Sequence, residues 1–257
     1  MSSVYVEDTD LAVAWGKALQ KATQPVVRDL LPLIVSVTGF SATGMVTEDR
    51  SIRSSLDNTL SSQGLQSVNT VANTIFPIAL WNPAAPRSAL FSRYQALLPR
   101  LRVASPKNRH GLYFERMLTG GPAGSENQLE FALSAYGART GVRRSILQLA
   151  VFQPTRDHST AAMLGFPCLQ HVTFAPARDG LSVNAFYATQ YLVERAYGNY
   201  LGLCRLGQFV AHELRVPLQR VTCYTGLAEV AISKSAIKDV LKDIGQAVEA
   251  RQSDKAN

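Results

Sequence analysis

The chain has 257 residues, of which 46% are hydrophobic and 18% are charged. These proportions are typical of globular proteins and exclude an intrinsically disordered chain, and the length fits one large domain. The formal net charge of +7 favours anionic partners, either a small phosphorylated ligand or nucleic acid.

Acidic residues precede the first apolar segment, namely Glu7, Asp8 and Asp10. A secretory signal peptide would carry positive charge there. No stretch of the sequence approaches the roughly 20 consecutive apolar residues that a membrane helix needs. We therefore expect a cytoplasmic protein without a membrane segment.

The N-terminal half shows helical and extended patterns in turn. Residues 9–20 are predicted to form a helix capped by Thr9 or Asp10, and residues 32–38 an apolar strand. A polar loop with Gly39 and Gly44 follows. Further predictions are a helix in the second half of residues 57–76, a turn at 83–86, a helix at 89–98, and polar loops at 105–110 and 119–124.

The C-terminal half predicts helices interleaved with an antiparallel hairpin. Asp179-Gly180 lies between two alternating segments, 168–175 and 181–191, and indicates a hairpin turn because glycine accepts positive φ freely. The pattern is typical of an α+β fold, which we expect as a single domain over residues 1–257. The other expected elements are helix 127–138, strand 145–152, helix 197–214, short strand 220–224 and helix 235–252.

The three cysteines are Cys168, Cys204 and Cys223. They are too few for a disulfide framework, and no second Cys/His pair accompanies Cys168 and His171, so we expect no metal. Cys168 follows Pro167 where a strand begins, a position from which a thiol can face a pocket. Neighbouring arginines would lower the pKa of such a thiol. The alternative is that Cys168 is a small buried hydrophobic residue.

Two arginine motifs flank this cysteine. Arg143-Arg144 precedes the strand predicted at 145–152, and Arg195 stands between the hairpin and helix 197–214. Guanidinium groups from separate segments could surround one phosphate. Taken singly, each arginine is better explained as solvated surface charge. Because the basic residues are dispersed along the chain, the net charge argues against a nucleic-acid-binding arm.

The order of these motifs resembles the thymidylate synthase family, including its pyrimidine-nucleotide hydroxymethylase relatives. That family carries an Arg-Arg pair before a strand, a Pro-Cys-His nucleophile and a Gln-Arg-Ser-x-Asp-x-x-Leu-Gly segment. The resemblance divides the chain into a divergent part (1–110), a best-matching core (111–230) and a C-terminal helix (231–257). The matching segments here are Arg143-Arg144-Ser145-Ile146, Pro167-Cys168 and Glu194-Arg195-Ala196-Tyr197-Gly198-Asn199-Tyr200-Leu201-Gly202.

The resemblance implies a mixed sheet with flanking helices in a homodimer built sheet on sheet. It also implies a transferase. Cys168 would add to C6 of a pyrimidine nucleotide, so that C5 attacks the one-carbon unit of 5,10-methylenetetrahydrofolate, giving a methyl or hydroxymethyl product. Arg195 would hold the nucleotide phosphate. Arg143 and Arg144 would reach a phosphate across the dimer interface.

Several family positions that read the base and sugar are changed in this sequence. Leu169, Ala196 and Gly198 replace the family's histidine, serine and aspartate. The base-reading asparagine falls at Leu206, which cannot hydrogen-bond, and residues 68–73 contain no counterpart of the catalytic glutamate. We expect other polar side chains to read the ligand's base and sugar, namely Gln170, Glu194, Asn199, Arg205 and Gln208.

Three functions are open on the sequence alone. The first is an enzyme that adds a one-carbon unit to C5 of a pyrimidine nucleotide and requires Cys168. The second is a nucleotide-binding or regulatory protein without turnover, which explains the missing glutamate better and whose binding would survive Cys168→Ser. The third is a partner-binding module that binds no nucleotide. The retained thiol favours the first function, because a binding site alone has no need of a nucleophile.

Overall fold

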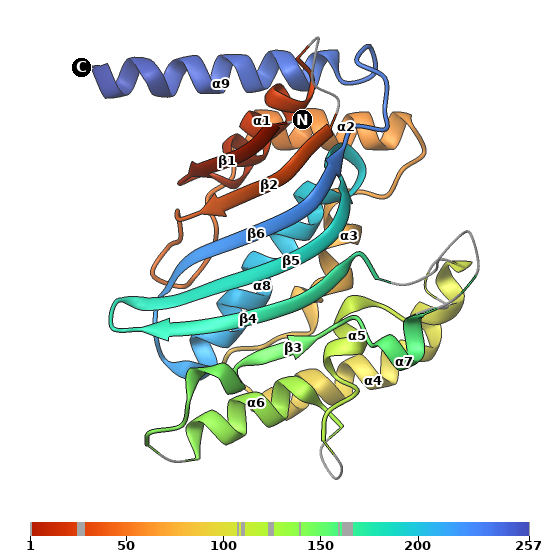
Figure 1. The fold of residues 1–257 in the computed structure, drawn as a ribbon, viewed down its shortest axis with the longest axis vertical. Coiled ribbons are helices and arrows are strands. Elements are labelled where there is room, and N and C mark those ends of the chain that lie inside the picture. Colours follow the sequence, from red (N-terminus) through yellow and green to blue (C-terminus); the bar gives the residue numbers. More distant parts are fainter. Residues whose placement is uncertain are drawn as a thin grey trace.

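The computed structural model describes residues 2–24, 29–106, 108, 111–122, 126–138, 140–158, 160 and 167–256. One six-stranded mixed sheet runs through these residues in the order β1-β2-β6-β5-β4-β3 (Figure 1). The pairs β1/β2 and β5/β6 are parallel and the other neighbours are antiparallel. The strands are β1 (Ser2–Asp8), β2 (Asp29–Val37), β3 (Gln148–Ala150), β4 (Leu169–Ala177), β5 (Gly180–Tyr191) and β6 (Leu218–Glu229).

Helices pack on one face of this sheet and around its β3 edge (Figure 1). On the packed face lie α1 (Leu11–Ala22), α3 (Val68–Ile75) and α8 (Tyr197–Leu214), with α2 (Arg50–Ser62) and α9 (Lys238–Ala256) beside α1. At the β3 edge lie α4 (Arg87–Ala104), α5 (Tyr113–Met117), α6 (Gln128–Gly137) and α7 (Pro154–Asp157). Short helical turns are η1 (Ile78–Leu80), η3 (Arg144–Ile146) and η4 (Leu192–Ala196).

The opposite face of the sheet is open across β6, β5 and β4 as far as the structure describes the chain (Figure 1). Phe186 and Tyr224 stack on it, with ring centroids 5.1 Å apart and planes inclined by 15°. Phe186 remains 42% exposed. These two rings remain in contact with water unless a partner covers this face of the sheet, and exposed apolar groups of this kind mark interaction surfaces.

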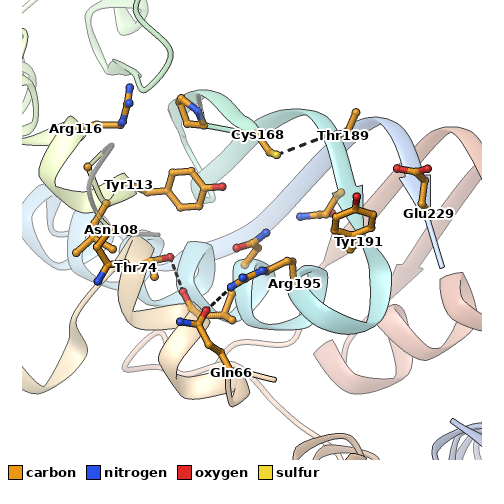
Figure 2. Close-up of a pocket in the computed structure, with 16 residues that line it drawn as sticks. Gln66, Thr74, Asn108, Tyr113, Arg116, Cys168, Thr189, Tyr191, Arg195 and Glu229 are labelled. Atoms are coloured by element: carbon orange, nitrogen blue, oxygen red, sulfur yellow. Dashed lines mark hydrogen bonds between the residues drawn. The ribbon is translucent and has the colours of Figure 1, made fainter. Parts of the chain in front are cut away.

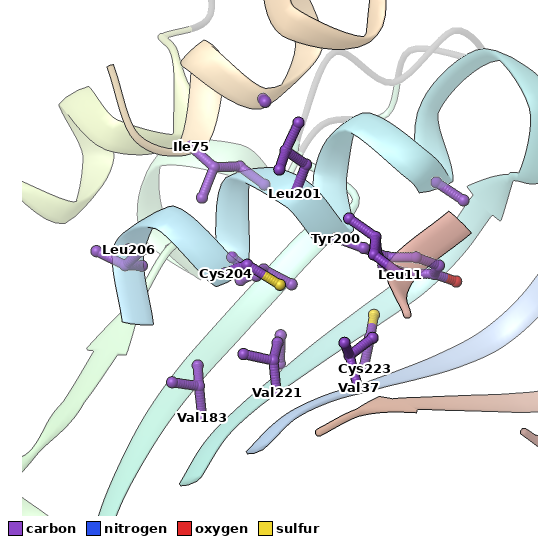
Figure 3. Close-up of a cluster of buried hydrophobic side chains, with 14 of the residues drawn as sticks. Leu11, Val37, Ile75, Val183, Tyr200, Leu201, Cys204, Leu206, Val221 and Cys223 are labelled. Atoms are coloured by element: carbon purple, nitrogen blue, oxygen red, sulfur yellow. The ribbon is translucent and has the colours of Figure 1, made fainter. Parts of the chain in front are cut away.

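Helix α8 lies over the centre of the sheet and forms the middle of the core (Figure 3). Its residues Cys204 and Leu206 lie above Val183 of β5 and Val221 of β6 (Figure 3), and all four are fully or almost fully buried. Burial of this face contributes more to the stability of α8 than intrinsic helix propensity does, because most helical stability in proteins comes from tertiary packing.

Glycines in α8 let α3 approach it closely. A Cβ added at Gly202 would lie 2.7 Å from the Ala72 carbonyl oxygen and 2.8 Å from Ile75 Cβ. One turn earlier, a Cβ at Gly198 would lie 2.5 Å from Val71 Cβ. Real Cβ atoms do not approach neighbours this closely, so both positions need glycine for the two helices to pack as they do.

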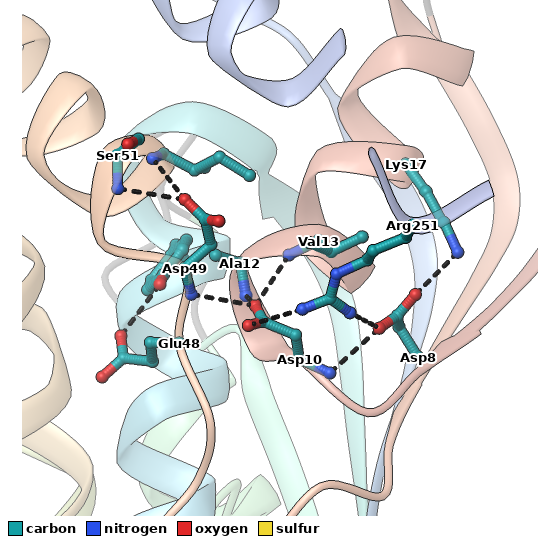
Figure 4. A network of polar contacts seen from close by, with 11 residues as sticks. Asp8, Asp10, Ala12, Val13, Lys17, Glu48, Asp49, Ser51 and Arg251 are labelled. Atoms are coloured by element: carbon teal, nitrogen blue, oxygen red, sulfur yellow. Dashed lines mark hydrogen bonds and ion pairs between the residues drawn. The ribbon is translucent and has the colours of Figure 1, made fainter. Parts of the chain in front are cut away.

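A buried carboxylate joins the starts of two helices to the C-terminal helix (Figure 4). Asp10 caps α1, where one of its oxygens accepts from the backbone N–H groups of Ala12 at 2.8 Å and Val13 at 3.1 Å. The same oxygen accepts from the N–H of Asp49, which itself caps α2. The other oxygen accepts from Arg251 of α9 at 3.0 Å. One side chain thus fixes α1, α2 and α9 relative to one another.

The α+β class predicted from the sequence is confirmed, and so are the hairpin and the long helix that follows it. The hairpin closes through Arg178-Asp179, with Ala177 paired to Gly180. The predicted strand 145–152 is wrong in its first part, because η3 occupies residues 144–146 and β3 is short. Strand β1 and helix α2 were not predicted, and β6 extends well beyond the strand predicted at 220–224.

We expect Gly202→Ala to destabilise the protein by about 1–3 kcal/mol, because the new methyl group overpacks the α3–α8 contact. Gly245→Ala in α9 is the matched control, since no neighbour lies within 4 Å of its added Cβ. We expect that change to stabilise by about 0.5–1 kcal/mol through helix propensity. Urea unfolding of both variants measures the difference, and equal effects would contradict the packing argument.

Candidate functional site

A cavity of about 290 Å³ lies at one end of the sheet, where β4 begins and β5 and β6 end (Figure 2). Side chains from segments far apart in sequence line it, including Cys168 before β4, Arg195 in η4 and Asn199 in α8. These three are sequence-predicted site residues, and the fold brings them to one cavity. Figure 2 shows Cys168 and Arg195 on opposite sides of it.

The Cys168 thiol is exposed at this cavity. Its sulfur lies 3.7 Å from the Thr189 hydroxyl on the neighbouring strand. The turn that presents it is held by Gln170, whose side-chain amide donates to the carbonyl oxygens of Pro167 at 2.6 Å and Cys168 at 3.3 Å. Gln170, predicted to read the ligand, therefore uses its amide donor to brace the turn that carries the thiol.

Tyr113 of α5 points its hydroxyl into the space near Cys168 (Figure 2). Burial raises the pKa of Tyr113, and the adjacent Cys168 sulfur raises it further. The phenol is therefore protonated at neutral pH and can donate a hydrogen bond to the thiolate or to a ligand atom bound beside it. Sequence reasoning missed this residue as a site residue.

Arg195 is held in place by contacts on both sides of η4. Trp15, buried in α1, donates its indole N–H to the Leu192 carbonyl oxygen at 2.7 Å and fixes the start of this turn. The Arg195 guanidinium donates to the side-chain oxygen of Gln66 at 2.5 Å. A guanidinium has five N–H donors, so this contact orients the group and leaves it able to bind an oxyanion in the cavity.

The other residues predicted to read the base and sugar lie in different places. Asn199 is 3% exposed and lines the cavity, whereas Glu194 is half-buried within η4 and is not part of the described lining. Arg205 donates to the side chains of Asn69 and Asn73, and Gln208 donates to the Thr43 carbonyl oxygen.

Arg205 and Gln208 therefore do not line the described cavity, and their role in reading the ligand stays a prediction. The physical reason for their position is the helical period. Residues six and nine positions after Asn199 point about a third and half of a turn away from it on α8. Only the side of α8 that carries Asn199 faces the cavity.

Arg143 and Arg144 are exposed beside β3 and do not line the cavity of their own chain. Their predicted role is to reach, across a dimer interface, a phosphate bound in a second copy of the chain. That role stays a prediction.

Two further polar residues of the lining were not predicted. Gln190 comes from the end of β5 and Glu229 from the end of β6. Glu229 is the only carboxylate among the described lining residues, and α3 contributes Val71 and Thr74 instead. The sequence signal for Glu229 was its position at the end of a strand, but the predicted strand ended five residues too early for this to be seen.

A buried ion pair supports the wall behind Tyr113. Arg116 donates to both carboxylate oxygens of Asp157, at 2.7 and 2.9 Å, and to the Val151 carbonyl oxygen at 3.1 Å. Burial by itself would raise the pKa of Asp157, but the hydrogen bonds from Arg116 and from the Gln153 backbone bring it below its usual value. The positive charge of Arg116 is thereby neutralised, which leaves Arg195 as the other arginine of the described lining.

Comparison of the sequence with protein-family models gives no match, and comparison with curated proteins gives none either. Within the described ranges, no three or more His, Cys, Asp or Glu side chains gather in a way that could hold a metal ion. In the same part of the chain, no helix has the length and apolar character needed to span a bilayer.

The three thiols differ sharply in accessibility, which gives a test of the site. Burial raises the pKa of Cys223 to about 12 and also raises that of Cys204, while Cys168 is exposed. We expect iodoacetamide to add one group to the native protein, at Cys168, and three groups to the urea-unfolded protein. Intact-mass and peptide mass spectrometry measure this. Native modification that persists in Cys168→Ser would contradict the assignment.

Proposed function

We propose that this cavity binds a pyrimidine nucleotide and that Cys168 acts as a nucleophile in adding a one-carbon unit to C5 of the base. The observation that carries the proposal is the convergence of an exposed thiol and a positioned guanidinium on one cavity, from segments that the sequence resemblance had paired. Arg195 binds the phosphate, and the base lies toward Cys168.

In the first chemical step the Cys168 thiolate forms a bond to C6 of the ring. The electron pair of the C5=C6 double bond moves toward C5 and the C4 oxygen, giving an enolate whose C5 is a nucleophile. The Tyr113 phenol donates a hydrogen bond near the sulfur and stabilises the thiolate before the addition. After C5 has bonded to the one-carbon unit, C5 loses its proton, the electron pair of that C–H bond re-forms the C5=C6 double bond, and the Cys168 thiolate leaves C6 to restore the free enzyme.

The resemblance supplies 5,10-methylenetetrahydrofolate as the one-carbon donor. The described cavity, at about 290 Å³, is at the lower limit of small-molecule sites, and no described residue of its lining is assigned to a pterin. The identity of the one-carbon donor therefore rests on the resemblance alone.

A second candidate is a nucleotide-binding or regulatory protein without turnover. One observation favours it: α3 presents Val71 and Thr74 to the cavity where the resemblance places a catalytic glutamate. Glu229, at the end of β6, is a carboxylate in the same cavity that the first candidate uses in place of that glutamate. The two candidates differ in whether the bound base reacts.

Binding is tested first. We expect uridine or cytidine monophosphate, in the ribo or deoxy form, to raise the Tm by about 5–10 °C at a concentration one hundred times its Kd. Arg195→Ala should abolish most of this shift, and the corresponding nucleosides should give none, because the phosphate contributes much of the affinity. Differential scanning fluorimetry measures the shifts. If all four monophosphates fail to stabilise the native chain, the proposal is wrong.

Turnover is tested without any one-carbon donor. Reversible addition of the thiolate to C6 lets C5 take a deuteron from D₂O and lose its proton, so deuterium accumulates at C5. We expect this exchange, followed by mass spectrometry of the nucleotide, with the native chain but not with Cys168→Ser, which should still bind. Binding without exchange by the native chain would establish the second candidate instead.

We also propose a homodimer in which the open sheet faces pack on each other and bring Arg143 and Arg144 to the second site. Support comes from the uncovered face and the exposed Phe186–Tyr224 stack. We expect sedimentation velocity to show a dimer that Phe186→Glu dissociates. Val103→Glu in α4 is the control, because Val103 is 84% exposed and far from that face. A native chain that sediments as a monomer at tens of micromolar would refute the dimer.

A further inference from the structure

The lining of the cavity contains a buried amide whose donor side has no partner among the described residues. Gln190 is 4% exposed and lines the cavity, and its Nε2 atom is buried without a hydrogen bond to any described group. A buried N–H group without an acceptor costs folding free energy, so native proteins rarely keep one unless water or a ligand satisfies it.

The other end of this amide is fixed. Thr225 of β6, fully buried, donates its hydroxyl to the Gln190 Oε1 atom at 3.1 Å. Because the carbonyl end accepts this bond, the NH₂ end is directed away from Thr225. An NH₂ group can only donate. The lining of the cavity therefore contains a buried hydrogen-bond donor whose direction Thr225 fixes.

The local backbone explains how this donor reaches the cavity. Inward-facing residues of β5 alternate as Leu181, Val183, Ala185 and Tyr187, and the next buried residue is Gln190. The break in alternation brings Thr189 and Gln190 to the same cavity, although consecutive strand residues ordinarily face opposite sides. Since Thr189 contacts the Cys168 sulfur, the amide donor is one residue away from the partner of the thiol.

We propose that Gln190 is a specificity-determining residue whose Nε2 donates to an acceptor atom of the bound base, either a ring carbonyl oxygen or an unprotonated ring nitrogen. This inference rests on the proposed function for the identity of the ligand as a nucleotide. Thr225 acts through Gln190 as a positioning residue. The amide on strand β5 supplies the base contact that Leu206, in α8, cannot make.

The experiment separates recognition of the base from recognition of the phosphate. Isothermal titration measures the Kd values of uridine 5′-monophosphate and of ribose 5-phosphate, which has no base. We expect Gln190→Leu to weaken binding of the nucleotide at least tenfold and to leave ribose 5-phosphate binding unchanged. Gln190→Glu replaces the NH₂ donor by a carboxylate oxygen, which faces the acceptor atom of the base and repels it. This change should weaken nucleotide binding further. Gln219→Leu, the same change at an exposed position of β6, should alter neither Kd.

Thr225 provides a second test that keeps residue 190 intact. Thr225→Val removes the hydroxyl that orients the amide and should weaken nucleotide binding about tenfold, whereas Thr225→Ser keeps the hydroxyl and should bind as the native chain does. A merely structural role would not give rescue by serine.

The outcomes distinguish this inference from the function on which it rests. If the native chain binds the nucleotide and Gln190→Leu binds it equally well, the inference is overturned and the proposed function stands. If Gln190→Leu does not fold, unchanged nucleotide binding by Thr225→Val overturns the inference. If the native chain binds no nucleotide at all, the proposed function fails and this inference fails with it.

Discussion

Close contact between α3 and α8 is the constraint on which the candidate site depends. Gly198 and Gly202 remove the side chains that would otherwise separate the two helices. The start of α8 carries Asn199, and the turn before it carries Arg195. Helix α3 supplies Val71 and Thr74, and Gln66 lies two residues before it. A wider spacing would move the guanidinium away from Gln66 and open the cavity to solvent, even though neither Gly198 nor Gly202 lines the cavity.

A second constraint is the end of β5, where the alternation of buried and exposed residues stops. Strict alternation would place Gln190 on the open face of the sheet, opposite the core. Instead Ala188 and Thr189 are both exposed and Gln190 is buried, where Thr225 fixes its carbonyl end. Thr189, the residue before it, contacts the Cys168 sulfur, so two consecutive residues at this strand end contribute to the cavity.

The sequence predicted what local patterns control. Helix 197–214, the Asp179-Gly180 hairpin and the α+β class follow from periodicity and turn chemistry, and the structure has all of them. Helix α2 was not predicted because its apolar positions are few among serines. Cys168, Arg195 and Asn199 were predicted from motif order, and they line one cavity. Arg205 and Gln208 follow the same helix away from the described cavity, because residues six and nine positions after Asn199 lie on other sides of α8. Gln190 was not among the predicted site residues, because strict alternation along a strand would face it away from the core.

The composition of the lining limits the ligands that the cavity can hold. Arg195, the Tyr113 hydroxyl and the Gln190 NH₂ group are donors, and Glu229 alone among the described lining residues carries negative charge. A ligand rich in acceptors and bearing a negative charge satisfies such a set, whereas a cationic ligand would leave the buried Gln190 donor unsatisfied. A nucleoside monophosphate has this arrangement, with a phosphate at one end and ring carbonyl oxygens at the other. Because the Arg195 guanidinium and the Cys168 thiol line the same cavity, we propose that one ligand contacts both.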